Sequence, residues 1–485
     1  MNTIQRIAKN TAVLLAATII SKVLGFFYVM YIARYLGAEG FGILSFALAF
    51  TGIFGVFTDL GLRSLTVREV ARDKSLAKKY LNNISVMKTI LVTITFALIV
   101  IVINLLGYPE QTIKVVYLIS VSVVFNSFTG MFYSIFRAFE KMEYQSLGQI
   151  LSSVLMLVGA LFAISQRFSV IGFASLYFMI SVVALVYSFV ISIWKFVKPK
   201  MKVDWSFWWP TIKEALPFGL TGAFITIYLW IDSVMLSLMK GDEVVGWYNA
   251  AYRLILVLLF IPSAFNSAVF PIMSRFYVSS KNSLKFMFEK HFKYMLIIGF
   301  PVGIGITLLA DRIVLLIFGA EYIPSVIALQ ILTWAIVFIF ARTAFERVLE
   351  SANKQIIVTK VFGGCALLNI ILNLMLIPKY SYIGAAVATL ITDFAVFALI
   401  FVWSLKIGYS IPNKQIIEVI SKVISASLLM GVFIEYFRDQ NLFILVFTTI
   451  IIYFGLILLI KCFDKDDIRL FKKLFSKKEE GSSDL

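Results

Sequence analysis

Residues 11–33 read TAVLLAATIISKVLGFFYVMYIA, an apolar stretch with one charged residue, Lys22, near its middle. A helix of this length crosses the hydrocarbon core of a bilayer, which takes about 20 residues. The Lys22 ammonium would then lie roughly 16 Å from either end, too deep to reach water easily. A charge at that depth costs about 2.5–3.5 kcal/mol. Lys22 should therefore either pair with an acid on a neighbouring helix or face a hydrated cavity for an anionic cargo, and we favour the cavity.

Apolar stretches of this kind recur along the whole chain. Of its 485 residues, 60% are hydrophobic, and we count about fourteen stretches of spanning length with short connections between them. Soluble domains are far less apolar than this. The sequence thus predicts an all-α polytopic membrane protein with about fourteen transmembrane helices.

The formal net charge of +17 is distributed unevenly. Most Lys and Arg residues fall in the connecting segments on the side of the N-terminus, as the positive-inside rule describes for cytoplasmic loops. We therefore expect a plasma-membrane protein with both termini in the cytoplasm. The charge then has an explanation that needs no nucleic-acid partner.

Cysteine and histidine are too scarce for most kinds of catalytic or metal site. Cys365 and Cys462 are the only cysteines, and the only histidine, His291, falls in a predicted basic cytoplasmic loop. A disulfide framework, a His-based metal site and a His-based catalytic site are thus excluded. No phosphate-binding loop motif is present either, so we expect a transporter rather than an enzyme, without direct ATP hydrolysis.

Three short motifs occur twice, in the same order. Gly-x-Glu-x-x-Gly occupies 37–42 and 241–246, an offset of 204; Arg-x-x-Glu-x4-Gln occupies 137–145 and 347–355, an offset of 210; Ile-Gly-x-Ala occupies 171–174 and 383–386, an offset of 212. The nearly constant offset indicates a duplicated unit of six helices. An even number of helices leaves both copies in one orientation, as in transporters with parallel repeats and a substrate path between them.

The duplication predicts four parts. They are an N-lobe of helices 1–6 (1–195), a C-lobe of helices 7–12 (196–406), two extra helices 13–14 (407–461), and a cytoplasmic amphipathic helix with a tail (462–485).

Two arginines join Lys22 as candidates for contact with an anionic cargo. Arg253 lies inside the outer end of helix 8, and its planar guanidinium suits phosphate oxygens. Asp232 on helix 7 could be level with Arg253 and pair with it instead, so both readings stay open. Arg34, at the outer end of helix 1, could line the cavity mouth or be an ordinary interface charge.

A second group of candidates is rich in oxygen atoms. Its members lie at similar depth on helices 7, 11 and 12: Asp232, Asn369, Asn373, Thr389 and Asp393. Such hard ligands could hold a coupling cation, Na⁺ or H⁺. The alternative is ordinary hydrogen bonding between helices.

The other embedded charges have simpler explanations. Asp59 and Arg63 are four residues apart and should form a structural ion pair. Lys88 and Arg342 lie near predicted cytoplasmic helix ends, where long side chains can extend to water.

The duplicated six-helix lobes, the two further helices and the run Ser21-Lys22-Val23-Leu24-Gly25-Phe26 resemble the multidrug/oligosaccharidyl-lipid/polysaccharide exporter superfamily. Within it, the chain is most similar to the O-antigen-type oligosaccharide flippases of polysaccharide biosynthesis. Lipid II flippases carry Ser-Arg-Val-Leu-Gly-Phe at this place and another arginine six residues later, where this chain has Tyr28. They can also hold sodium with residues that Asp232, Asn369, Asn373 and Thr389 resemble.

The resemblance implies a cargo of polyprenyl- or dolichyl-(pyro)phosphate-linked oligosaccharide, moved from the cytoplasmic to the outer leaflet by alternating access. It implies membrane lipids as surroundings, a glycan polymerase or ligase as a candidate partner, and a monomer. The driving force would be an ion gradient, the membrane potential or consumption of the glycan.

Three alternatives compete with this reading. A cation-coupled multidrug antiporter of the same superfamily commonly uses an acid in helix 1, where this chain has Lys22 and no acid. A lipid II-type flippase is disfavoured by Tyr28. A membrane glycosyltransferase or polymerase would need catalytic carboxylates near a large aqueous loop, and no predicted outer loop is long enough.

Overall fold

The structure is a computed structural model that describes residues 3–198, 203–409, 413–464 and 467. The regular structure of these residues is entirely helical. Its elements are α1 (Thr3–Gly55), η1 (Val56–Thr58), α2 (Leu62–Arg72), η2 (Lys74–Leu76), α3 (Ala77–Leu105), α4 (Glu110–Ala138), α5 (Met142–Ser165), α6 (Val170–Lys195), α7 (Trp205–Lys240), α8 (Asp242–Leu258), α9 (Phe260–Ser279), α10 (Lys281–Ile317), η3 (Ala320–Tyr322), α11 (Ser325–Ser351), α12 (Gln355–Lys406), α13 (Asn413–Tyr436) and α14 (Leu442–Leu459).

Within the described residues, 12 helical segments are long and apolar enough to cross a membrane, which confirms an all-α polytopic membrane protein. The count of fourteen crossings is not confirmed and stays a prediction. Two of the long helices contain a non-helical residue: Gly37 in α1 (φ 69°, ψ −179°) and Ser381 in α12 (φ 54°, ψ −136°). Each break falls between two of the predicted apolar stretches: Gly37 between 11–33 and 41–61, and Ser381 between 356–377 and 383–405.

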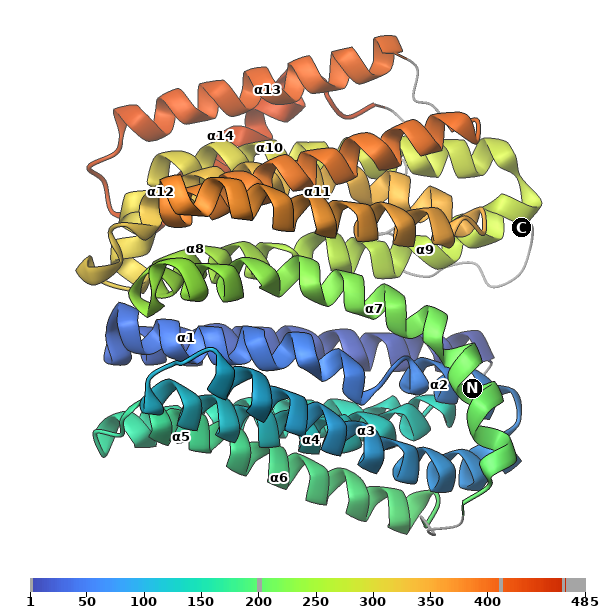
Figure 1. Cartoon of the computed structure of the whole chain (residues 1–485). Helices are drawn as coiled ribbons and strands as arrows, with labels where there is room; N and C mark the ends of the chain where they lie inside the picture. Colours follow the sequence, from blue (N-terminus) through green and yellow to red (C-terminus); the bar gives the residue numbers. More distant parts are fainter. Residues whose placement is uncertain (1–2, 199–202, 410–412, 465–466, 468–485) are drawn as a thin grey trace.

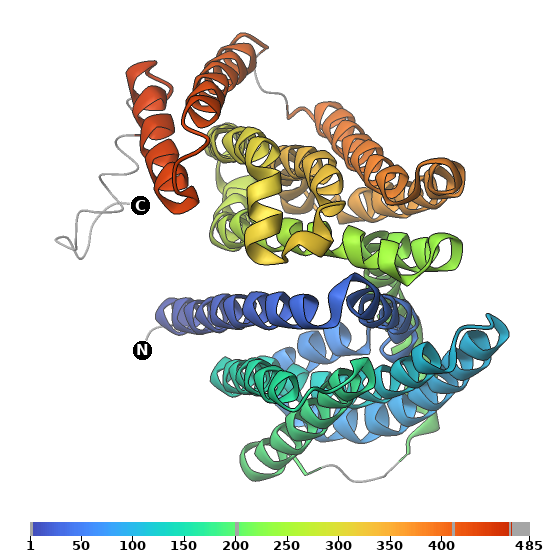
Figure 2. The same cartoon turned by 90° about the vertical axis from the view of Figure 1, so that its left-hand side faces the viewer.

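The helices form two groups. Figure 1 shows α1–α6 in one group and α7–α12 in the other, with α13 and α14 on the outer side of the second group. The turned view in Figure 2 shows the same separation, with α1 of the first group facing the second. The predicted boundary at 195/196 falls between α6 and α7, and that at 406/407 falls at the end of α12. The predicted amphipathic helix and tail lie almost wholly outside the described residues.

The two ends of the helix bundle differ. At one end of the bundle α1 bends and α8 begins, and we call this the Gly37 end (Figure 1). The opposite end contains α2, and we call it the α2 end. The largest group of buried apolar side chains spans both helix groups and includes Phe41 and Leu44 of α1 together with Val245 and Tyr248 of α8. The two groups are therefore packed against each other at the Gly37 end.

Two glycines of the repeated motif lie at this contact. A side chain on Gly42 would collide with the carbonyl oxygen of Asp242, and one on Gly246 would collide with the carbonyl oxygen of Ala38. Gly42 and Gly246 occupy the same position in the repeat, as do Ala38 and Asp242. The crossing of α1 and α8 is thus pseudosymmetric, and glycine lets the two backbones touch.

Polar contacts cross the same seam. The Glu321 carboxylate accepts a hydrogen bond from the Ala38 N–H (2.6 Å), at the start of the helix that follows the bend, where the helix dipole favours an anion. The Tyr322 hydroxyl donates to the Ala33 carbonyl (2.8 Å). The Nε–H of Arg34 donates to the Ile317 carbonyl (2.8 Å) at the end of α10, where the dipole favours a cation. Arg34, a predicted cargo contact, is thus engaged between the lobes.

Replacing Gly42 by Val should loosen the Gly37 end, because the new side chain can fit only if α1 and α8 separate. Overpacking of this kind costs about 1–3 kcal/mol, so we expect the closed-to-open ratio to fall at least about fivefold and the labelling rate to rise accordingly. The measurement is the maleimide-labelling rate of a reporter cysteine at the buried position Val245, in a chain whose two buried native cysteines are replaced by alanine. Gly455→Val is the control, since a side chain there meets open space. Unchanged labelling in a folded Gly42→Val protein would refute the glycine seal.

Candidate functional site

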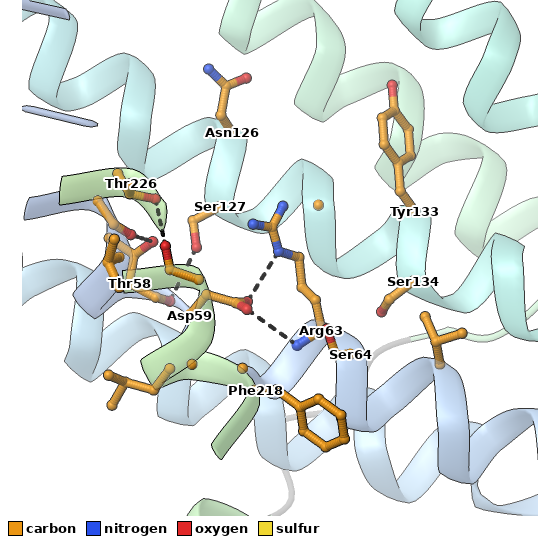
Figure 3. A pocket seen from close by; sticks show the side chains of 18 of the residues that line it. Thr58, Asp59, Arg63, Ser64, Asn126, Ser127, Tyr133, Ser134, Phe218 and Thr226 are labelled. Atoms are coloured by element: carbon orange, nitrogen blue, oxygen red, sulfur yellow. Dashed lines mark hydrogen bonds and ion pairs between the residues drawn. The ribbon is translucent and has the colours of Figure 1, made fainter. Parts of the chain in front are cut away.

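A large cavity lies toward the α2 end, between α7 and the helices of the first group. Its volume is about 830 Å³. Figure 3 shows part of its lining, in which residues from α2 and α4 face α7. Its polar lining residues are Thr58, Asp59, Arg63, Ser64, Asn126, Ser127, Tyr133, Ser134, Arg137, Gln145, Gln149 and Thr226.

Lys22 lies in an adjoining pocket of about 350 Å³ formed by α1, α4, α5 and α6. Asn126, Tyr133 and Gln149 line both this pocket and the large cavity. Hydroxyl and amide side chains surround Lys22, and among the described residues no acidic side chain lines its pocket. Of the two alternatives for Lys22, the geometry thus favours a polar cavity over neutralisation by an acid.

Asp59 in the large cavity lies between two cations. The Lys88 ammonium contacts Asp59 Oδ1 at 2.6 Å, and also donates to Ser127 Oγ (2.9 Å) and to the Thr58 carbonyl (3.1 Å). Arg63 Nε contacts the same carboxylate oxygen at 3.2 Å, so the predicted Asp59–Arg63 contact is present.

The prediction that Lys88 extends to water is wrong, because its side chain is 0% exposed. The side chain of Arg63, by contrast, is 52% exposed. Since Lys88 already neutralises Asp59, the charge of Arg63 is available to the cavity.

A second arginine of this cavity is Arg137, at the end of α4. Its Nε–H donates to Gln145 Oε1 (2.7 Å), which orients the guanidinium beside the cavity. Asp59 is the only acidic residue in the described lining, so Arg63 and Arg137 leave the cavity positively charged. Our sequence reasoning did not select Arg137, although the residue opens one of the duplicated motifs.

The sequence left open whether Arg253 pairs with Asp232 or contacts an anionic cargo, and in the structure the two side chains do not form an ion pair. Its guanidinium lies over the Trp230 ring, with 5.5 Å between the central carbon and the ring centroid. Its Nε is buried and has no hydrogen-bond partner among the described residues. Neither Arg253 nor Arg34 lines the two cavities described above.

The predicted oxygen-rich cluster does assemble around Asp232. Asn373 Nδ2 donates to Asp232 Oδ1 (2.6 Å), and Thr389 donates to Asp232 Oδ2 (2.6 Å). Asn369 Oδ1 accepts from Asn373 Nδ2 (2.9 Å). A residue missed from the sequence, Tyr248, donates to Asp232 Oδ2 (2.6 Å).

This cluster has the composition of a monovalent cation site. Asp232 is its one acid, and the buried Asn373 Oδ1 has no hydrogen-bond partner among the described residues. One carboxylate with neutral oxygens suits Na⁺, whereas a divalent ion ordinarily gathers several carboxylates. Among the described residues, no group of three or more His, Cys, Asp or Glu could hold a metal.

Asp393, predicted as a member of this cluster, makes its contacts elsewhere. It accepts from Arg342 Nη1 (2.9 Å) and from the Tyr228 hydroxyl (2.6 Å). Arg342 Nε also lies 3.0 Å from Glu346 Oε1. The prediction that Arg342 extends to water is therefore wrong, since Arg342 is buried between two acids.

The position predicted for His291 is also wrong. His291 is fully buried within α10, which begins ten residues earlier than the histidine and leaves no loop there. Its ring packs against Phe265 with 4.7 Å between centroids, and the Thr343 hydroxyl lies 3.4 Å from Nε2.

Comparison with known proteins identifies similar sequences. The family described as "Polysaccharide biosynthesis protein" matches residues 7–277, and the MatE family matches residues 217–375. The chain is 26% identical to the capsular polysaccharide biosynthesis protein CapF of Staphylococcus aureus, over 80% of this chain and 96% of that protein. It is 24% identical to the probable low-salt glycan biosynthesis flippase Agl15 of Haloferax volcanii, over 79% of this chain and 80% of that protein. An uncharacterized membrane protein of Methanocaldococcus jannaschii, MJ1068, is 29% identical, but the match spans only about half of each chain (50% and 47%).

Among solved structures, the lipid II flippase MurJ in an inward closed conformation has a similar fold. The TM-score is 0.77 at 20% identity, covering 94% of this chain and 98% of that chain.

The Lys88–Asp59 pair gives a stability prediction. Replacing Lys88 by Met should destabilise the protein by about 3 kcal/mol, the low end for breaking a buried pair, because Arg63 remains beside the carboxylate. Adding Asp59→Asn should recover more than half of that loss, since the unpaired charge is then gone. The measurement is thermal unfolding of the purified variants in detergent. Additive losses in the double variant would contradict the proposed charge compensation.

Proposed function

The chain belongs to the polysaccharide biosynthesis protein family, whose members are membrane transporters and not enzymes, and on this premise we propose that it is a flippase for polyprenyl- or dolichyl-(pyro)phosphate-linked oligosaccharide. The cargo would pass from the cytoplasmic to the outer leaflet, for polysaccharide or glycan biosynthesis. The names of CapF and Agl15 place those two proteins in capsule and glycan biosynthesis, which supports the same role here.

The positively charged cavity is the observation that carries the proposal. Arg63 and Arg137 line it, Lys22 lies in the pocket that adjoins it, and its one acid is already paired with Lys88. One guanidinium group can donate two parallel hydrogen bonds to the oxygens of a phosphate, and such charge-assisted bonds are strong in a site shielded from bulk water. The lipid chain of the cargo can remain in the bilayer.

Alternating access fits the difference between the two ends. The Gly37 end is held by backbone contact and by Glu321, Tyr322 and Arg34, whereas the large cavity lies toward the α2 end. With the predicted topology, the α2 end is cytoplasmic, so this arrangement would receive cargo from the inner leaflet. Release would require the Gly37 end to open and the α2 end to close.

We assign the coupling ion to the Asp232 cluster. Asp232, Asn369, Asn373 and Thr389 would hold a sodium ion, with Tyr248 as a further oxygen. A proton on Asp232 is the other candidate, because a buried carboxylate can be neutralised either way.

A cation-coupled multidrug antiporter remains the second candidate, because the MatE family matches residues 217–375. That match lies within the C-lobe and includes Asp232. The excess of cations in the N-lobe cavity disfavours cationic drugs there, since like charges repel. A lipid II-type flippase would share the anion chemistry and differ in the glycan.

Replacing Lys22 by Ala should reduce complementation of a flippase-deficient strain to below about a tenth of the wild-type level. The reason is that a charge-assisted hydrogen bond to phosphate is worth about 1.5–3 kcal/mol. Lys22→Arg should retain much of the activity, since it keeps the charge. Expression of each variant is checked by immunoblot, and Lys114→Ala is the control because Lys114 is exposed and pairs with Glu110. Full activity of Lys22→Ala would refute the cationic cavity.

Replacing Asp232 by Asn should abolish stabilisation of the purified protein by sodium. The wild-type protein should melt at a higher temperature in NaCl than in KCl of equal ionic strength, because an ion that binds only the folded state stabilises it. Asp311→Asn, which changes an exposed acid of α10, should keep the sodium response. A response to pH and not to sodium would indicate a proton, and an unchanged sodium response in Asp232→Asn would refute the assignment.

A further inference from the structure

The duplication relates the large cavity to a second pocket in the C-lobe. This pocket has a volume of about 420 Å³ and lies between α9 and α11. Its described lining consists of Leu259, Pro262, Ser263, Asn266, Ser267, Phe270, Pro271, Ile339, Thr343 and Arg347.

The repeat offsets map the lining of one cavity onto that of the other. An offset of 204 converts Asp59, Arg63 and Val67 of the large cavity into Ser263, Ser267 and Pro271 of the C-lobe pocket. An offset of 210 likewise converts Tyr133 and Arg137 into Thr343 and Arg347. The two cavities thus lie at equivalent positions of the two repeats. Figure 1 shows α2 and α9 at the same end of the molecule, one in each helix group.

The copies differ in charge. In the N-lobe cavity, Arg63 and Arg137 exceed the single acid. In the C-lobe pocket serines replace Asp59 and Arg63, and the one cation, Arg347, is paired with Glu350 at 2.5 Å. The C-lobe pocket is therefore close to neutral, and a phosphate bound there would gain little electrostatic stabilisation.

The C-lobe pocket nevertheless offers hydrogen-bonding groups to a ligand. Ser263 and Ser267 lie one turn apart on the exposed face of α9. Asn266 Oδ1 is buried and has no hydrogen-bond partner among the described residues. The Phe270 ring adds an apolar surface to the lining. Hydroxyls, an amide and an aromatic ring are the groups that suit the hydroxyls and the C–H faces of a sugar.

We propose that the C-lobe pocket lined by Ser263, Asn266, Ser267 and Phe270 binds the saccharide part of the cargo, while the N-lobe cavity binds its phosphate. This inference rests on the proposed flippase function and adds a location for the glycan. Equivalent positions of the two repeats, charged in one and close to neutral in the other, would thus give two sites for the two polar parts of one amphiphile.

Two probes separate the parts of the cargo: farnesyl pyrophosphate, and the same lipid carrying one hexose or N-acetylhexosamine. Binding is measured on the purified full-length protein in detergent by tryptophan fluorescence. We expect the wild type to bind a glycosylated probe at least about tenfold more tightly than the sugarless one, as a few neutral hydrogen bonds allow. The variant Ser263→Ala/Asn266→Ala/Ser267→Ala should lose most of this gain and keep its affinity for farnesyl pyrophosphate.

Two further variants make the result specific. Arg63→Gln should weaken both probes by a similar factor, because it acts on the phosphate. Ser279→Ala, on the same helix α9 but outside the pocket, should change neither affinity. The inference is overturned if the triple variant keeps the full gain from the sugar, if it weakens both probes equally, or if no sugar improves binding to the wild type. Failure of the wild type to bind either probe would overturn the flippase proposal as well.

Discussion

A charge inside a membrane-spanning helix is tolerated when a partner neutralises it or a cavity hydrates it, and this constraint distinguishes two classes among the cationic side chains of this protein. Lys88 and Arg342 belong to the first class, because each is buried and contacts a carboxylate within 3 Å. Lys22, Arg63 and Arg137 belong to the second, because each lines a polar cavity. The neutralised groups hold helices together, and the hydrated groups form the site.

Features that depend on local sequence could be predicted well. Membrane class and helical structure follow from hydrophobicity and its spacing, both of which can be read directly from the sequence. The Asp59–Arg63 contact and the Asp232 cluster follow from residues that share a helix face or a depth. Depth is readable because each span has about the same length.

Features that depend on the rotation of a helix about its axis could not be predicted. Lys88 lies 29 residues from Asp59 in sequence, and hydropathy does not tell whether it points to Asp59 or toward water. Asp393 lies one turn from Thr389, yet it faces Arg342 and not Asp232. The charged neighbours of His291 predict a loop there. In the structure, Lys290 and Lys293 pair with Asp464, close to the end of α14, and α10 continues through the polar segment.

The helix α7 connects the two halves of the proposed mechanism. Thr226 of α7 lines the anion cavity of the N-lobe, and Asp232 of the same helix is the centre of the oxygen cluster in the C-lobe. Six residues separate them, which is about 9 Å along the helix. Any displacement of α7 that accompanies the proposed cation binding at Asp232 would therefore move one wall of the proposed phosphate site. A rigid helix shared by both sites is sufficient for coupling, provided that the cation favours one of its two positions.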